Sequence, residues 1–267
     1  MLGSTHRIKC SLLAVVGMFL WPGAGSAMAE ERGYVKVAGF LKEGRFEKDA
    51  TGHYADLVRA LLLETEVPTQ LVTMPVKRML KQFDDGYVQC MVPVSFPVVK
   101  MNFPHIEQAD VVESVPIDYI TAHIVTRPGT PAIAGVNGLK GKRLAVWVGV
   151  PFELFMPNPE ADVLRVESEE SGIRLLMSGR VDAIWSWVPD AYILFEKLGY
   201  EEPSLAIDQP IFGSTGHLLC RRDRKTEALM KDIDRSILAM RDDGRLKAIM
   251  GKHTRVVGVD VPADIGK

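Results

Sequence analysis

The sequence has few cysteines, no excess of basic residues and, after a short N-terminal stretch, no long apolar run. Its 267 residues include three cysteines, 32 lysines and arginines, and 34 aspartates and glutamates. With this near balance of charge, the sequence has no basic patch of the kind that binds nucleic acid. After the N-terminal stretch, no run approaches the roughly 20 apolar residues that span a bilayer. The histidines and cysteines show no metal-ligand spacing, and no Ser-His-Asp or Cys-His arrangement stands out. We therefore expect no nucleic-acid partner, metal, cofactor or catalytic residue.

The N-terminus has the pattern of a secretory signal peptide. Basic residues between positions 6 and 9 precede an apolar run at 12–21, and a small, turn-prone stretch ends in Ala27-Met28-Ala29. The apolar run is too short for a membrane span, and an A-x-A sequence is typical of a cleavage site. We predict a signal peptide over 1–29, cleaved after Ala29, and a periplasmic mature protein. A retained anchor helix is the weaker alternative.

Two cysteines, Cys90 and Cys220, remain after this segment. An oxidising compartment permits them to form a disulfide. Two buried free thiols are the alternative, and composition alone does not choose between these states.

One unit occurs in each half of the chain: an amphipathic helix, a glycine and a short apolar strand. The first copy is a helix at 76–85 that ends at Gly86, followed by a strand at 87–92. The second is a helix that ends at Gly179, followed by a strand that ends at Trp185. A glycine can take the left-handed conformation that ends a helix, and the period then changes to that of a strand. Two similar α/β lobes with a ligand between them are predicted.

The rest of the chain continues this alternation of strands and helices. Further strands are expected at 34–40, 70–74, 143–148 and 163–166, and further helices at 55–66 and 190–198 and from residues 150 and 171. Extended runs at 119–126 and 210–222 could carry the chain between the lobes, and helices are expected at 226–241 and 245–250. Such alternation predicts mainly parallel sheets covered by helices, with ligands at the carboxyl ends of the strands.

Several short motifs occur in a recognisable order. They are Gly52-His53-Tyr54-Ala55-Asp56-Leu57, Pro75 to Arg78, Leu139 to Val146, Gly179 to Ala183, and Leu238 to Ile249. With this order and spacing the chain resembles the family 3 extracellular solute-binding proteins, periplasmic receptors that mostly deliver amino acids to ABC transporters.

The resemblance implies the type II periplasmic-binding-protein fold. In that fold each of two α/β lobes is a mainly parallel sheet with flanking helices, and two hinge strands join the lobes, which close on the ligand. It places lobe 1 at 30–120 and 215–267, and lobe 2 at 121–214. It also implies a small-molecule ligand, an ABC permease or membrane sensor protein as partner, and a monomer. The strands of Cys90 and Cys220 lie side by side in this family, which permits the disulfide.

The chain departs from the family where amino acids bind. The family has an arginine shortly after the third strand, and residues 95–100 offer only Lys100. The family also places a carboxylate just after a second-lobe strand, where this sequence has Ser186 and Trp187, with Asp190 a turn later. A lysine lacks the guanidinium fork that matches a carboxylate in two bonds. These departures argue against a standard α-amino acid as the ligand.

The candidate ligand-binding residues are polar and aromatic. They are Tyr54, Arg78, Ser95, Lys100, Gly149, Phe152, Ser186, Trp187 and Asp190. The backbone at 149–152 could receive an anion at a helix start, although a routine helix start is the preferred interpretation. A glutamate run at 167–170 is interpreted as a solvated helix entry.

These observations predict a receptor, not an enzyme, that captures a small polar or aromatic-containing solute. The first alternative is a dehydratase-like enzyme on the same fold, with Glu153 or Asp190 as its general acid. The second is a ligand-free protein-interaction module.

Overall fold

The computed structural model describes residues 33–148, 150 and 152–265, and from Tyr34 onward they form one compact unit. The expected signal peptide at 1–29 lies outside the described residues. Within the described part of the chain, no helix is both long enough and apolar enough to cross a membrane.

The first sheet is parallel at its centre. Strand β1 (Val35–Phe40) pairs in parallel with β2 (Thr69–Met74) and with β3 (Cys90–Val94). Strand β10 (Phe212–Arg221) pairs antiparallel to β3 on one side and to β4 (Val111–Glu113) on the other.

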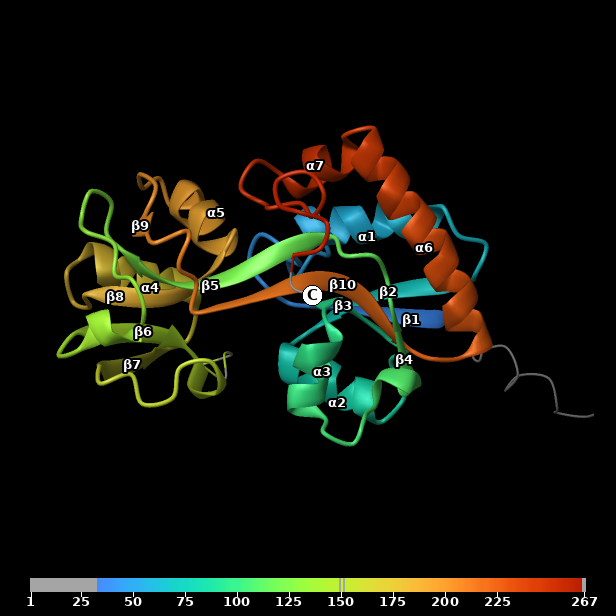
Figure 1. Cartoon of the computed structure of the whole chain (residues 1–267), viewed down its shortest axis with the longest axis horizontal. Helices are drawn as coiled ribbons and strands as arrows, with labels where there is room; N and C mark the ends of the chain where they lie inside the picture. The colour runs from blue at the N-terminus through green and yellow to red at the C-terminus, as the bar shows by residue number, and fades with distance from the viewer. Residues whose placement is uncertain (1–32, 149, 151, 266–267) are drawn as a thin grey trace, which may run out of the picture. The chain divides into compact units, whose positions relative to one another are not determined.

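Helices cover both faces of this sheet (Figure 1). Helices α1 (His53–Leu63), α6 (Arg224–Asp242) and α7 (Arg245–Met250) lie on one face, and α2 (Val76–Asp84) and α3 (Phe96–Asn102) lie on the other. The buried positions of α6 include Leu229, Ile233 and Ile237, and this four-residue recurrence gives the helix one apolar face. Each face of the sheet has its own hydrophobic cluster.

The second sheet is built from the middle of the chain. Its strands are β5 (Asp118–Thr126), β8 (Ala183–Val188), β6 (Arg143–Trp147), β7 (Asp162–Val166) and the short β9 (Ser204–Leu205). Helices α4 (Glu169–Met177) and α5 (Asp190–Lys197) pack against it. The chain also has three short 3₁₀ turns among its described residues: η1 (Gln108–Asp110) just before β4, and η2 (Val136–Leu139) and η3 (Phe152–Leu154) on either side of β6.

Two long antiparallel strands connect the sheets. Strand β5 pairs with β10 from Asp118 opposite Gly216 to Ala122 opposite Phe212. From Thr121 onward β5 also pairs with β8, and from His217 onward β10 pairs with β3 and β4. The fold is therefore the expected α/β arrangement of two lobes joined by two strands, and we propose that the lobe boundaries lie close to residues 120 and 214.

The structure also joins Cys90 to Cys220. The two residues are register partners in β3 and β10, and a disulfide connects them with their Cα atoms 4.0 Å apart. The bond fastens the returning strand to the centre of the first sheet.

Several expected element boundaries differ from the structure. The strand expected at 87–92 is β3, Cys90–Val94, and the helix expected at 55–66 is α1, His53–Leu63. Helix α4 begins at Glu169 and not at Ser171, because the Ser168 side chain accepts a hydrogen bond from the Ser171 amide and caps the helix earlier. The helix expected near residue 150 is only the three-residue turn η3.

Candidate functional site

A cavity of about 180 Å³ lies between the two lobes, with walls from both sheets and both connecting strands. Most of its lining is apolar. The aromatic lining residues are Phe40, Trp147, Phe155, Trp187 and Phe212, and the charged ones are Lys42, Arg45 and Asp190. Phe40 and Trp147 are the last residues of β1 and β6, so the cavity lies at the carboxyl ends of parallel strands.

Trp187 is the centre of an aromatic cluster on the second-lobe side. Its ring centroid lies 4.8 Å from that of Trp185, 6.0 Å from that of Phe155 and 6.1 Å from that of Phe212. Trp185 is buried in the core, whereas Trp187 lines the cavity. Strand alternation turns Ser186, between them, to the opposite face.

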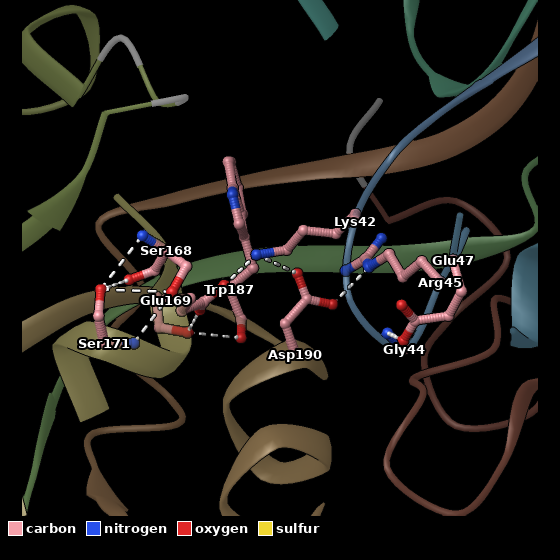
Figure 2. A network of polar contacts seen from close by, with 10 residues as sticks. Lys42, Gly44, Arg45, Glu47, Ser168, Glu169, Ser171, Trp187 and Asp190 are labelled. Atoms are coloured by element: carbon pink, nitrogen blue, oxygen red, sulfur yellow. Dashed lines mark hydrogen bonds and ion pairs between the residues drawn. The ribbon is translucent and has the colours of Figure 1, made fainter. Parts of the chain in front are cut away.

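Four charged side chains form a buried cluster beside these rings (Figure 2). Lys42 Nζ donates to Glu169 and lies 3.5 Å from Asp190 Oδ2. Arg45 Nε donates to Asp190 Oδ1, and the Ser186 hydroxyl donates to Glu169. Lys42 and Arg45 follow β1 in lobe 1, whereas both carboxylates stand at the starts of lobe-2 helices α4 and α5. The contacts therefore bridge the lobes.

The two acidic side chains of the cluster favour the charged forms of its two basic ones. Burial alone would lower the pKa of the Lys42 ammonium, but Glu169 and Asp190 outweigh that effect and raise the pKa above its ordinary 10.5. Burial likewise opposes the charge on Arg45, and Asp190 foremost overcomes it, so this pKa is raised too. Two basic side chains are thus paired with two acidic ones in the wall of the cavity.

Hydroxyl groups form an uncharged polar part of the wall, where the end of β3 lies beside β10. Ser95 Oγ and Ser214 Oγ are 2.8 Å apart, and both residues line the cavity. Thr215 lines it as well, and its hydroxyl lies 2.7 Å from His217 Nε2. These groups can give and accept hydrogen bonds but carry no fixed charge.

A buried tyrosine and aspartate lie behind the cavity where the connecting strands begin to pair. The Tyr54 hydroxyl donates to Asp118 Oδ1, and the Arg45 guanidinium lies 5.5 Å from the centre of the Tyr54 ring. Among the described residues, Asp118 Oδ2 and Arg45 Nη2 are buried without a hydrogen-bond partner. Burial foremost raises the pKa of Asp118, although Arg45 and the Tyr54 hydrogen bond oppose the rise.

This raised pKa gives a pH-dependent prediction for Asp118→Asn. The pKa of Asp118 is higher in the folded state than its unfolded value of 3.8, so the protonated side chain stabilises the fold at low pH. That contribution is lost as the pH rises through the folded-state pKa. The amide cannot ionise, so the stability of the variant relative to the original protein should increase between pH 3 and 7. Urea midpoints measured across this range test it. A difference that is constant or falls with pH would contradict the assignment.

The structure brings some of the sequence-predicted residues to the cavity. Ser95, Trp187 and Asp190 line it, whereas Ser186 does not and its hydroxyl donates a hydrogen bond to Glu169.

The remaining candidates lie elsewhere or are engaged differently. Arg78 is exposed on α2, and Lys100 binds Glu107 and the carbonyl oxygens of Pro104 and Ile106. Phe152 is buried beneath the Arg165 guanidinium, 4.7 Å from its ring centre. None of these three lines the cavity, and Tyr54 is 1% exposed behind it. Gly149 lies outside the described residues. Of the anion site expected at 149–152, the structure describes Val150 and the start of the short turn η3 at Phe152.

Sequence reasoning missed the three residues that dominate the polar side of the site. Lys42 and Arg45 fall in a stretch interpreted as a polar turn, yet they directly follow the first strand, where ligand sites concentrate. Glu169 was interpreted as part of a solvated helix entry, and this interpretation was wrong, because the residue is 6% exposed and engages Lys42.

The candidate general acids are both held in ion pairs. Glu153 is largely exposed and binds Arg165, with 2.9 Å between Oε1 and Nη2, and Asp190 is bound by Arg45. Within the described residues, no group of three or more histidine, cysteine, aspartate or glutamate side chains could hold a metal ion.

Comparison of the sequence with protein-family models and with curated proteins finds no match. Solved structures do match. The GluR0 ligand-binding core from Nostoc punctiforme in complex with L-glutamate has a TM-score of 0.63 at 16% identity, covering 80% of this chain and 96% of that one. A Streptococcus pneumoniae amino acid ABC transporter substrate-binding protein bound to L-arginine has a TM-score of 0.61 at 18% identity, covering 83% and 94%.

A histidine kinase sensor domain with similarity to periplasmic binding proteins also matches, with a TM-score of 0.61 at 15% identity, covering 84% of this chain and 97% of that one. At these identities the likeness establishes the fold and not the ligand. Together with the two sheets and their connecting strands, it shows that the chain has the two-lobed type II periplasmic-binding-protein fold.

Proposed function

We propose that the protein is a non-catalytic receptor of the family 3 solute-binding type, which captures a small solute with an aromatic or other apolar body between its lobes. It would act in the periplasm and present the solute to an ABC permease or a membrane sensor. The cavity carries this proposal, because both lobes contribute aromatic residues to its walls, and closure of the lobes would bury the solute on both sides.

The chemistry of the walls favours binding over catalysis. A general acid or base needs a titratable group free to exchange a proton with the substrate. Asp190 is the carboxylate that lines the cavity among the described residues, and it is engaged by Arg45 and lies near Lys42. The hydroxyls of Ser95 and Ser214 can orient a polar end of the solute, while the indole of Trp187 packs on its apolar part.

The matched structures support a receptor role in general terms. One is titled a substrate-binding protein of an ABC transporter, and another a histidine kinase sensor domain. The first neighbour is consistent with a transport partner, and the second has this fold as the sensor domain itself.

Thermal unfolding of the purified protein against a panel of small molecules tests the receptor. The panel contains aromatic acids, neutral aromatics, amino acids, polyamines and sugars, and we expect an aromatic, ammonium-free compound to stabilise the fold. A ligand at a hundred times its dissociation constant adds roughly 2.7 kcal/mol, which is a readily measured shift.

Trp187→Ala should weaken the response to that compound by at least about tenfold in affinity, because the substitution removes a large aromatic contact. Leu238→Ala, at a 43% exposed position on α6 outside the cavity, is the control and should leave the response unchanged. Stabilisation by no member of the panel, or equal binding by the Trp187 variant, would contradict the proposal.

A further inference from the structure

We infer that Lys42 determines what this cavity excludes: its ammonium fills a built-in cation site, so the cavity takes solutes that lack an ammonium group. This inference rests on the proposed function, because it concerns the specificity of the same site. It assigns to Lys42 the place that a positively charged ligand would otherwise occupy.

The surroundings of Lys42 Nζ are those of an ammonium-binding site. Glu169 accepts its hydrogen bond, Asp190 Oδ2 lies 3.5 Å away, and the centre of the Trp147 ring lies 4.8 Å away. Two carboxylates and an aromatic face are a strong combination for an organic cation when they are shielded from water. The Lys42 and Glu169 side chains are 5% exposed and that of Asp190 is 1% exposed.

Both carboxylates are engaged on their other oxygen as well. Glu169 accepts from Ser186, and Asp190 accepts from Arg45. An ammonium group entering the cavity would therefore have to displace Lys42, which belongs to the same chain. A tethered competitor acts at a high effective concentration, so a free cation competes poorly.

The segment that carries Lys42 is organised to reach across to lobe 2. The Phe46 amide donates to the Lys42 carbonyl at 2.9 Å, and the Gly44 amide donates to Glu47 Oε1 at 2.8 Å. Gly44 has φ +77°, and a Cβ added there would lie 2.8 Å from Ile193 Cγ2 on α5. The turn thus rests directly on the lobe-2 helix whose first residue is Asp190.

Chemical rescue of Lys42→Ala tests the inference. The substitution leaves Glu169 without its cation and opens space that is continuous with the cavity. Propylammonium contains the methylene groups and ammonium that the substitution removes, so it should refill the site. At ten times its dissociation constant it should raise the thermal midpoint of Lys42→Ala by roughly 3–6 °C. Sodium chloride at equal ionic strength and 1-propanol should not.

Lys42→Met is the matched control, because it removes the ammonium but keeps most of the side-chain volume. It should respond to propylammonium no more than the original protein does. If Lys42→Ala is unfolded in buffer, its refolding from urea with and without propylammonium becomes the readout. A response shared by all three proteins, or no rescue of Lys42→Ala in either format, would overturn the inference.

This outcome is independent of the ligand screen. Failure of every panel compound to bind the original protein would remove the receptor proposal, yet rescue would still show an internal cation site. Conversely, an aromatic ligand could bind without any rescue of Lys42→Ala. In that case the receptor would stand and the role assigned to Lys42 would fall.

Discussion

Replacing Lys42 with methionine is expected to lower the free energy of unfolding by about 3–5 kcal/mol, because it leaves a carboxylate buried without its cation. Glu169 is 6% exposed and has the Ser186 hydroxyl as its other hydrogen-bond partner. A hydroxyl compensates a buried negative charge far less than an ammonium does. Urea denaturation at pH 7 measures the loss.

Two comparisons separate this effect from a general loss of charge. Lys81→Met removes the partner of an exposed ion pair with Asp85 on α2, where the lysine side chain is 75% exposed, and should cost no more than about 0.5 kcal/mol. Adding Glu169→Gln to Lys42→Met should recover part of the loss, since it removes the uncompensated charge. A Lys42→Met protein within about 1 kcal/mol of the original would show that Glu169 is not held as described.

Removing the disulfide should have a comparable effect. Cys90 and Cys220 are fully buried and 130 residues apart in sequence, so their bond closes a very long loop in the unfolded chain and lowers its conformational entropy. Loss of a native disulfide typically costs about 2–5 kcal/mol, and on the chain-entropy model long loops lie toward the upper end. The urea midpoint of the oxidised protein should therefore exceed that of the Cys90→Ala/Cys220→Ala variant.

Reduction provides a check that leaves the sequence unchanged. The original protein, unfolded and then refolded with a reductant present, should approach the stability of the double variant, which itself should not respond to the reductant. An oxidised protein that shows two free thiols on titration, or a midpoint that reduction leaves unchanged, would argue for the alternative of two buried thiols.

Much of the fold could be predicted because its signals are local. Apolar residues recur at helical spacing on α2 and α6, and Gly86 and Gly179 take φ of 78° and 72° at the helix ends that they were expected to terminate. Strand β8 also placed Trp187 beside the cavity, since alternation along the strand left few choices. Such features depend on residues that are close together in the sequence, so they can be predicted without knowing which distant segments meet.

The polar part of the candidate site could not be predicted in this way. Lys42 and Glu169 are 127 residues apart, and Arg45 and Asp190 are 145 residues apart, so their pairing depends on how the two lobes meet. A glutamate at the start of a helix is normally solvated, and only the approach of lobe 1 buries Glu169. Lys100 was chosen for its charge near the third strand, but its ammonium binds the local carbonyl oxygens of Pro104 and Ile106.

The pairing of β5 with β10 restricts the ways in which the two walls of the cavity can move. Five successive residue pairs, from Asp118 opposite Gly216 to Ala122 opposite Phe212, fix how far one strand can slip along the other. A two-stranded ribbon bends and twists readily, whereas slippage by one residue would turn every side chain to the opposite face. If the lobes open as the proposed receptor function requires, this ribbon would let them swing apart without sliding past each other, and Trp187 and Ser95 would return to the same positions in the cavity wall.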